Sequence, residues 1–384
     1  YKDVQTIEFT IENNKLYMLQ TSAADRTAEA ALKIAVDMVS EELITQKTAI
    51  LRQDAEKMEQ VISKIESGAI PCESELKRNY DTLMEWVDDV RELKVRVNAD
   101  SAGQAAEAAK LGAEGIGLCR TENMLYNDGK MPMLKEMLLT QDIANREEML
   151  QNLKEEQKRN FEQLYRIMGE RPVTIRLLDL PVTLPEITEM QTRAIIEAAM
   201  NVRAAGIPVH VEIMVPLVGN HKELRYQKNI IDRTADEVFA ERNDKIDYMV
   251  GTMIEVPRAA VTANQIAEVA EFFSFGTNDL TQMTLGFSRD DIAKFLPVYL
   301  EKGILKNDPF QILDRNGVGQ LVREAVLKGR STRLQLKCGI CGEHGGEPSS
   351  VEFCHYAGLN YVSCSPFRVP IARLAAAHAA LTGK

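Results

Sequence analysis

The chain has 384 residues, 45% of them hydrophobic, and a net charge of −11 from 57 acidic against 46 basic residues. This length is too great for one ordinary globular core and fits an α/β barrel of roughly 250 residues with an appended segment of about 100. The acidic balance disfavours nucleic acid and anionic membranes as partners, and no run of about 18 apolar residues predicts a membrane span.

The N-terminal residues predict a two-stranded hairpin. Residues 4–20 alternate polar and apolar side chains on both sides of Asn13-Asn14. The pattern begins directly at Tyr1, without a start methionine or a signal peptide. Because a lone hairpin is marginal in water, we expect residues 1–25 to be the edge of a domain whose remainder belongs to a larger protein.

Residues 26–92 are expected to be helical. From Arg26 to Ser67, apolar residues recur at helical spacing with many charges between them. The sequence Gly68-Ala69-Ile70-Pro71 interrupts this helix, because Pro71 cannot continue it. A further helix is expected from about Glu73 to Leu93. We interpret residues 26–92 as a helical connector rather than a catalytic unit.

Beyond Leu93, short apolar runs alternate with helical stretches. Near-continuous apolar strands that alternate with helices indicate a parallel sheet covered on both faces. Eight such units over residues 93–384 fit a closed (β/α)8 TIM barrel, with a doubly wound open sheet as the alternative. The runs begin near Leu93, Gly115, Val173, Val209, Met249, Phe272, Leu336 and Tyr361.

Polar residues follow most of these runs. Active sites of such barrels lie at the carboxyl ends of the strands. Glu255 and Asp279 end two successive runs, and paired carboxylates suit Mg²⁺; the alternative is that Glu255 is a surface charge and Asp279 a helix N-cap. The polar strand-end residues are Asn98, Arg120, Arg176, Glu255, Asn278, Asp279, Cys341, and Ser363 or Ser365.

The basic strand ends suggest an anionic substrate. Arg120 and Arg176 have the fork geometry to hold a phosphate or a carboxylate, although a single arginine is more often a surface or salt-bridge residue. Gly276, Thr277 and Asn278 offer backbone N–H groups at the start of a helix, which suits a small anion. Together with Mg²⁺, which stabilises an oxygen that becomes negative, these residues predict a site for a small phosphorylated acid.

The Cys338-Gly339-Ile340-Cys341 stretch has a CxxC pattern that is also found in zinc and redox sites. For zinc, Cys354 and His355 would have to fold back over the barrel mouth. We expect Cys338 to pack in the core, and Cys341 to reach the mouth with a thiol pKa low enough for proton exchange with a carbon acid. The alternative for Cys341 is a small buried hydrophobe.

The cysteine content also bears on location. Six cysteines over this length are too sparse for a disulfide framework. A reducing compartment is therefore expected. The cytoplasm is the first expectation and an organelle the alternative.

Five stretches carry recognisable motifs, at residues 116–122, 251–260, 273–282, 338–346 and 361–370. They resemble the pyruvate, phosphate dikinases, which are members of the phosphoenolpyruvate-utilising family. Phosphoenolpyruvate synthase and Enzyme I of the sugar phosphotransferase system share the shorter cores of these motifs. The resemblance covers the predicted barrel and residues 1–50.

This resemblance implies a phosphoenolpyruvate/pyruvate-binding barrel. Glu255 and Asp279 would hold Mg²⁺ in it. Arg120, Arg176 and Asn278 would bind the phosphoryl group of the substrate.

The resemblance also implies the remaining site roles and partners. Gly276 and Thr277 would bind substrate through their backbone, and Cys341 would move the proton at the methyl or methylene carbon. The phosphoryl group would arrive from a phosphohistidine on a separate domain. A homodimer formed through the barrel is expected.

Three departures from the family pattern stand out. None of the five histidines lies in the Thr-Ser-His context of the phosphohistidine domain. Near the N-terminus, Glu8 and Gln20 match nucleotide-contacting positions, whereas Ser22 replaces an arginine. Residues 177–185 connect strand to helix where the family has a long insertion.

We therefore expect a half reaction between pyruvate and phosphoenolpyruvate that needs a phosphohistidine domain. Two alternatives are a catalytically silent dimerisation fragment and a phosphoenolpyruvate synthase-type enzyme. A weaker one is a carboxylate lyase with Mg²⁺-enolate chemistry, which the two phosphate-ready arginines disfavour.

Overall fold

The computed structural model describes residues 2–66, 71, 73–127, 129–179, 182 and 184–383. These fall into two compact units, Tyr1–Glu92 with Arg373–Lys384, and Leu93–Ala372. The predicted helix interruption at 68–70, Cys72, and part of the predicted connection 177–185 lie outside the described residues.

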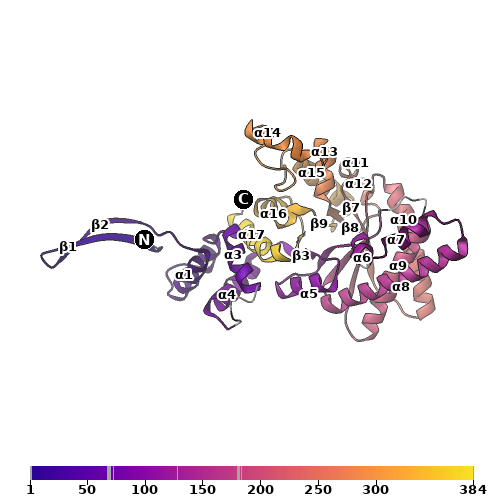
Figure 1. Cartoon of the computed structure of the whole chain (residues 1–384), viewed down its shortest axis with the longest axis horizontal. Coiled ribbons are helices and arrows are strands. Elements are labelled where there is room, and N and C mark those ends of the chain that lie inside the picture. The colour runs from indigo at the N-terminus through magenta and orange to yellow at the C-terminus, as the bar shows by residue number, and fades with distance from the viewer. Residues whose placement is uncertain are drawn as a thin grey trace. The chain divides into compact units, whose positions relative to one another are not determined.

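The first unit begins with the predicted hairpin, drawn in indigo in Figure 1. Strand β1 (Gln5–Glu12) pairs antiparallel with β2 (Lys15–Ala23). Asn13 and Asn14 form the turn with φ of 51° and 58°. Asparagine tolerates this left-handed conformation, which matches the right-handed twist of the strands.

One face of the hairpin is apolar. Cross-strand partners such as Phe9 with Met18 and Ile11 with Leu16 lie on the same face, because directly opposed residues point to the same side. These four side chains and Ile7 are exposed. Among the described residues, nothing buries this face.

Short helices follow the hairpin. The single helix expected from Arg26 to Ser67 is instead divided, because Thr45 caps a new helix start and Glu42 has a φ of 57°. The helix expected after residue 73 is present. The helices are α1 (Ala28–Ser40), α2 (Gln46–Leu51), α3 (Ala55–Glu66) and α4 (Glu75–Val90).

The last residues of the chain belong to this unit. Helix α17 spans Val369–Thr382, and its part from Arg373 onward groups with residues 1–92. Arg373 Nη2 lies 2.5 Å from Oδ2 of Asp88, and His378 Nε2 lies 2.9 Å from the Ile50 carbonyl oxygen. These contacts join the C-terminal helix to α2 and α4.

The second unit contains a closed barrel of eight parallel strands, in the order β10-β3-β4-β5-β6-β7-β8-β9. The predicted TIM barrel is confirmed, and the open-sheet alternative is wrong because β10 pairs with β3. The strands are β3 (Lys94–Asn98), β4 (Ile116–Arg120), β5 (Pro172–Arg176), β6 (His210–Val215), β7 (Tyr248–Ile254), β8 (Phe272–Phe275), β9 (Lys337–Ile340) and β10 (Tyr361–Cys364).

Helices cover the outside of the barrel, with α8, α9 and α10 adjacent to one another (Figure 1). The segments between strands carry α5 (Ala102–Lys110), α6 (Thr121–Asn127), α7 (Met131–Leu139), α8 (Ile143–Met168), α9 (Pro185–Ala204), α10 (His221–Arg242), α11 (Pro257–Val261), α12 (Ala263–Ile266), α13 (Thr277–Leu285), η1 (Ile292–Lys294), α14 (Leu296–Glu301), α15 (Val318–Thr332), η2 (Glu343–Gly346) and α16 (Pro348–Tyr356). The short helix η3 (Pro366–Arg368) follows the last strand, β10.

The barrel interior contains a buried ionic cluster. Glu212 on β6 is fully buried and accepts hydrogen bonds from Arg96 Nη1 at 2.9 Å, Thr174 Oγ1 at 2.7 Å, and Lys337 Nζ. Burial alone would raise the pKa of Glu212, but Arg96 and Lys337 lower it to about 2. The carboxylate is therefore ionised and joins strands β3, β5, β6 and β9.

Tyr361 on β10 lies next to this cluster. The Arg96 guanidinium lies 4.0 Å from the centre of the Tyr361 ring, a cation–π contact. A Cβ at Gly339 on β9 would lie 2.1 Å from Cζ of Tyr361. Only glycine at position 339 leaves room for the ring.

Candidate active site

Glu255 and Asp279 come together at the carboxyl end of the barrel. Glu255 follows β7 and is 1% exposed, and Asp279 lies in the first turn of α13, which begins directly after β8. Burial, together with the side-chain hydrogen bond and the charge of Asp279, raises the pKa of Glu255 to about 8, although the Leu217 N–H and Arg176 act in the opposite direction. The two carboxyl groups therefore lie near enough to interact directly.

Leu217, in the loop after β6, orients Glu255. Its backbone N–H donates to Oε1 of Glu255 at 2.6 Å. Leu217 has a φ of 56°, a left-handed conformation that costs a non-glycine residue about 1–2 kcal/mol. This unusual backbone places a donor at the carboxylate.

The carboxylate pair fits a divalent cation. No group of three or more His, Cys, Asp or Glu side chains is arranged for a metal in the part of the chain that the structure describes. Mg²⁺ commonly uses only one or two carboxylates, with waters and substrate oxygens completing its shell. A cation between Glu255 and Asp279 would also offset the repulsion by which Asp279 raises the pKa of Glu255.

Arg120, the last residue of β4, is held rigidly. Its Nη2 and Nε lie 2.7 Å and 3.0 Å from Oδ2 of Asp100, and its own N–H donates to Oδ1 of Asp100 at 2.7 Å. Asn123 also donates to Asp100. The Asp100 side chain is 3% exposed and that of Arg120 is 34% exposed. Asp100 therefore fixes the guanidinium while one side remains open to a ligand.

Arg176, the last residue of β5, is more buried. Its Nη2 pairs with Glu122, and its Nη1 lies 3.8 Å from Sδ of Met253. Nε of Arg176 and Oε2 of Glu122 are buried and have no hydrogen-bond partner among the described residues. Arg176 also interacts electrostatically with Glu255 and Cys341. The strand ends of β5, β7 and β9 therefore converge, as predicted, and Nε is a donor in need of an acceptor.

The residues at the start of α13 differ in whether their backbone N–H groups are already hydrogen-bonded. The N–H of Gly276 donates to the Ile254 carbonyl at 3.1 Å, and the expected backbone contact from Gly276 to substrate stays a prediction. A Cβ at Gly276 would lie 3.0 Å from Cβ of Glu255. Thr277 and Asn278 begin the helix, where N–H groups have no partner within the helix.

Cys341 follows β9 and is 4% exposed. Burial raises the pKa of its thiol to about 11, although the nearby Ser274 hydroxyl and the charge of Arg176 act in the opposite direction. The predicted low pKa is therefore wrong, because the exposed mouth position assumed for the thiol is in fact buried. At neutral pH the group is a protonated thiol.

The other strand-end residues mostly bind the protein itself. Asn98 Nδ2 donates to the Cys341 carbonyl at 3.0 Å, and Ser363 Oγ donates to Oδ1 of Asn98 at 2.6 Å. Cys338 and Cys354 are buried, and burial raises the pKa of each thiol to about 12. A thiolate at either position would be costly.

The chain matches a known protein family over most of its length. A family model described as "PEP-utilising enzyme, PEP-binding domain" matches residues 74–184 and 180–381, well over half of the chain. The chain belongs to this phosphoenolpyruvate-utilising family. The two matches meet at residues 180–184, inside the connection that was expected to lack a long family insertion.

Relatives in this family are named pyruvate, phosphate dikinases. The Clostridium symbiosum protein is 37% identical over 559 residues, covering 100% of this chain and 64% of that protein. The Rhizobium meliloti (strain 1021) protein is 37% identical over 100% of this chain and 62% of its own length. The chloroplastic protein 1 of Oryza sativa subsp. japonica is 48% identical over 81% of this chain and 38% of that protein. The chain spans less than two thirds of each relative.

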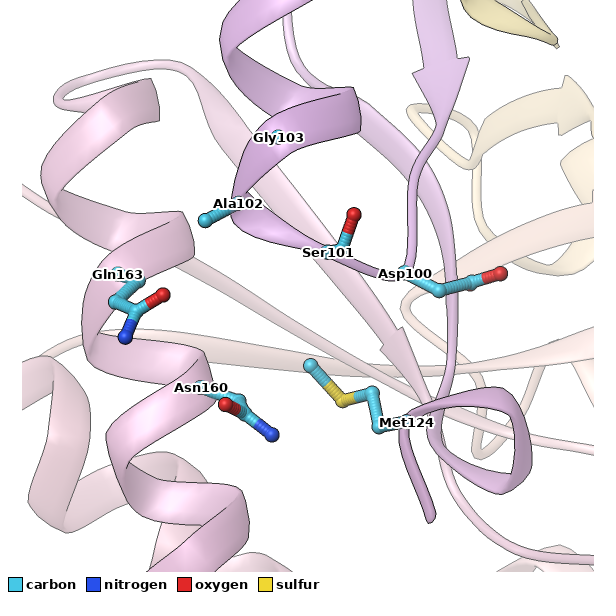
Figure 2. Close-up of a pocket in the computed structure, with 7 residues that line it drawn as sticks. All are labelled: Asp100, Ser101, Ala102, Gly103, Met124, Asn160 and Gln163. Carbon is cyan, nitrogen blue, oxygen red and sulfur yellow. The ribbon is translucent and has the colours of Figure 1, made fainter. Parts of the chain in front are cut away.

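Within this family architecture, a cavity of about 260 Å³ lies beside the Asp100–Arg120 pair (Figure 2). The start of α5 forms one side of it, and Met124 of α6 faces it from another (Figure 2). The lining residues are Asp100, Ser101, Ala102, Gly103, Met124, Asn160 and Gln163. Of the strand-end side chains, none lines this cavity, so it is separate from the carboxylate pair.

Four residues of this candidate site were not predicted from the sequence. Asp100 and Glu122 hold the two arginines, Arg289 lies 3.1 Å from Oδ1 of Asp279, and His344 contacts Thr277. Glu122 and His344 lie inside the family-like stretches, which was an available signal. Asp100 and Arg289 lie outside them and become evident only from the fold.

No helix in the described residues combines the length and apolar character needed to cross a membrane.

Proposed function

We propose that this chain carries the substrate-binding half of a phosphotransferase that interconverts pyruvate and phosphoenolpyruvate. The single observation that carries the proposal is the convergence of Glu255, Asp279 and Arg176 at one barrel end, in a chain of the phosphoenolpyruvate-utilising family. Arg120 projects from the neighbouring strand β4. Two cations face a carboxylate pair, which suits a phosphorylated acid with a bound metal.

Glu255 and Asp279 are the residues that would hold Mg²⁺. When bound, this ion supplies positive charge to an oxygen that becomes an enolate. Arg289 now pairs with Asp279 at 3.1 Å. We propose that Arg289 leaves Asp279 when the metal binds and then turns towards the anionic substrate.

Arg120 and Arg176 would bind the phosphoryl group. Asp100 orients Arg120, so little side-chain entropy remains to be lost on binding. Nε of Arg176 is buried without an acceptor, and a phosphoryl oxygen would satisfy it. The N–H groups at the start of α13 and the Asn278 side chain would bind the remaining oxygens.

Cys341 would donate the proton to the methylene carbon of the enolate and remove it in the reverse direction. In the direction of pyruvate, the S–H bond breaks, a C–H bond forms at the methylene carbon, and the enolate becomes a ketone. The thiol is protonated, as this step requires, and the charge of Arg176 and the nearby Ser274 hydroxyl favour the thiolate that remains. In the reverse direction the thiolate would take the proton back.

The other parts of the assignment are also proposals. Residues 1–25 would be the tail of an ATP-grasp nucleotide domain, which agrees with the exposed apolar face of the hairpin. Residues 26–92 would be a helical linker and residues 93–384 the barrel domain. A phosphohistidine domain would deliver the phosphoryl group, and the barrel would form a homodimer in the cytoplasm.

Calorimetry on this chain tests the proposal. Phosphoenolpyruvate should bind in the presence of Mg²⁺, and Glu255→Ala should abolish binding. Glu268→Ala, which removes an exposed carboxylate outside the site, is the matched control and should bind normally. Unchanged affinity in Glu255→Ala would contradict the proposal. A dimer that binds neither pyruvate nor phosphoenolpyruvate would favour the alternative of a catalytically silent dimerisation fragment.

A further inference from the structure

His344 joins two segments of the barrel domain that are far apart in sequence. It lies in η2, three residues after Cys341, and is fully buried. Its Nδ1 lies 2.7 Å from Oγ1 of Thr277, and its Nε2 lies 2.8 Å from the Pro309 carbonyl oxygen. Both ring nitrogens are therefore engaged.

These partners determine the tautomer of His344. A carbonyl oxygen only accepts, so Nε2 must carry the hydrogen that is donated to Pro309. Burial lowers the pKa of His344 and outweighs the opposite effects of the Pro309 carbonyl and of three nearby carboxylates, Glu347, Glu343 and Asp308. In the neutral ring, Nδ1 has a lone pair and accepts the hydroxyl hydrogen of Thr277.

The neighbours of His344 also contact the start of α13. A Cβ at Gly342 would lie 2.0 Å from Oγ1 of Thr277, so glycine is needed for the close approach. The N–H of Glu343 donates to Oδ1 of Asn278 at 3.0 Å. Because Oδ1 is used as an acceptor, the NH₂ of the Asn278 side chain is the group left to donate to an anion.

We infer that His344 is a positioning residue for the substrate site, which fixes the first turn of α13 by accepting the Thr277 hydroxyl. Its second bond, to Pro309, attaches this turn to the segment 286–313, which carries Arg289. His344 thus holds together the helix start that would bind the substrate anion and the segment that reaches Asp279. The inference rests on the proposed function of this site.

Two substitutions of His344 each remove one of its two hydrogen bonds and can retain the other. In His344→Asn, the side-chain oxygen can take the place of Nδ1 and accept from Thr277, but the side chain is too short to reach Pro309. In His344→Gln, the side-chain nitrogen can take the place of Nε2 and donate to Pro309, while the bond with Thr277 is lost. The two variants therefore form a matched pair.

The affinity for phosphoenolpyruvate with Mg²⁺ should rank these variants. His344→Asn should stay within about twofold of wild type, and His344→Gln should weaken binding by about five- to tenfold, the size expected for one hydrogen bond. Thr277→Val, which removes the hydroxyl but keeps the shape, should weaken binding by a similar factor. The double variant Thr277→Val with His344→Gln should be no weaker than either single variant.

Thermal unfolding of the same variants distinguishes positioning from general structural support. The inference is overturned if His344→Asn and His344→Gln lose affinity equally, if Thr277→Val binds like wild type, or if the affinities simply follow the melting temperatures. If the wild-type chain itself does not bind phosphoenolpyruvate, the proposed function fails, and a separate measurement decides the state of the ring.

That measurement is ¹⁵N NMR of the histidines in the wild-type chain. It should show a neutral His344 ring with its hydrogen on Nε2 at pH 7, and the Nδ1 resonance should shift in Thr277→Val. A ring protonated on Nδ1, or a resonance unchanged in Thr277→Val, would overturn the inference without any substrate.

Discussion

The backbone N–H of Leu217 lies 2.6 Å from Oε1 of Glu255. The donor comes from the loop after β6 and the acceptor from the end of β7. This loop therefore orients one of the two carboxylates that we propose as metal ligands. It does so through backbone alone, since the Leu217 side chain is exposed.

This relationship predicts opposite results for two substitutions at position 217. Glycine adopts a φ of 56° without cost and keeps the N–H, so Leu217→Gly should retain phosphoenolpyruvate affinity and change stability by no more than about 1 kcal/mol. Proline lacks the N–H and cannot adopt positive φ, so Leu217→Pro should lose Mg²⁺-dependent binding. Calorimetry on folded variants checks this; normal binding by the proline variant would contradict it.

The buried cluster around Glu212 predicts acid sensitivity. Its folded-state pKa is about 2, below the ordinary value of 4.5, so its contribution to stability is present above pH 4.5 and is lost as pH falls towards 2. Glu212→Gln leaves Arg96 and Lys337 unpaired and should cost about 3–5 kcal/mol at pH 7. Denaturant unfolding across this pH range should show a weaker pH dependence in the variant.

The control for this prediction is Glu237→Gln on α10. The Glu237 side chain is 45% exposed and forms only surface ion pairs. Such pairs contribute about 0–1 kcal/mol, so this variant should unfold nearly as wild type does. Equal losses at positions 212 and 237 would show that the barrel interior does not depend on the buried carboxylate.

Two glycines should respond oppositely to alanine. A Cβ at Gly339 would collide with Tyr361, so Gly339→Ala should cost about 1–3 kcal/mol or more. A Cβ at Gly103 meets nothing within 4 Å, and Gly103 lies inside α5, so Gly103→Ala should be neutral or stabilise by up to about 1 kcal/mol. Thermal unfolding measures both, and a stable Gly339→Ala variant would show that the ring can move aside.

The proposed role of Cys341 predicts that its substitution affects proton transfer but not substrate binding. Cys341→Ala should bind pyruvate but stop Mg²⁺-dependent exchange of its methyl hydrogens with solvent, followed by NMR in D₂O. Cys338→Ala removes another buried thiol of the same strand region and should keep exchange. Exchange that continues in Cys341→Ala would assign the proton to another group.

The sequence was sufficient for the barrel because its strands are buried on both faces. The strands are therefore mostly apolar runs, and a polar residue often follows the run and marks the carboxyl end. The eight apolar runs predict all eight strands, and their carboxyl ends predict that Arg176, Glu255, Asp279 and Cys341 lie near one another. The prediction of the helical connector, residues 26–92, was less accurate, because propensity and spacing do not reveal that Thr45 caps a new helix.

Partners and pKa values were less accessible from the sequence. The Asp100–Arg120 pair spans 20 residues and depends on how the loop after β3 turns, which no local pattern specifies. The pKa of Cys341 was predicted with the wrong sign because it depends on packing. Nearby arginines suggested a lowered value, whereas burial dominates.

The pairing of β10 with β3 has a consequence for how the protein is made. These strands lie at opposite ends of the barrel sequence, and their ladder closes the ring. During synthesis, β3 leaves the ribosome long before β10 is made. The edge of β3 that pairs with β10 therefore lacks its partner strand, and is open to other chains, until residues 361–364 emerge. Ribosome-bound intermediates stalled before that point should therefore be the species that depend most on chaperones.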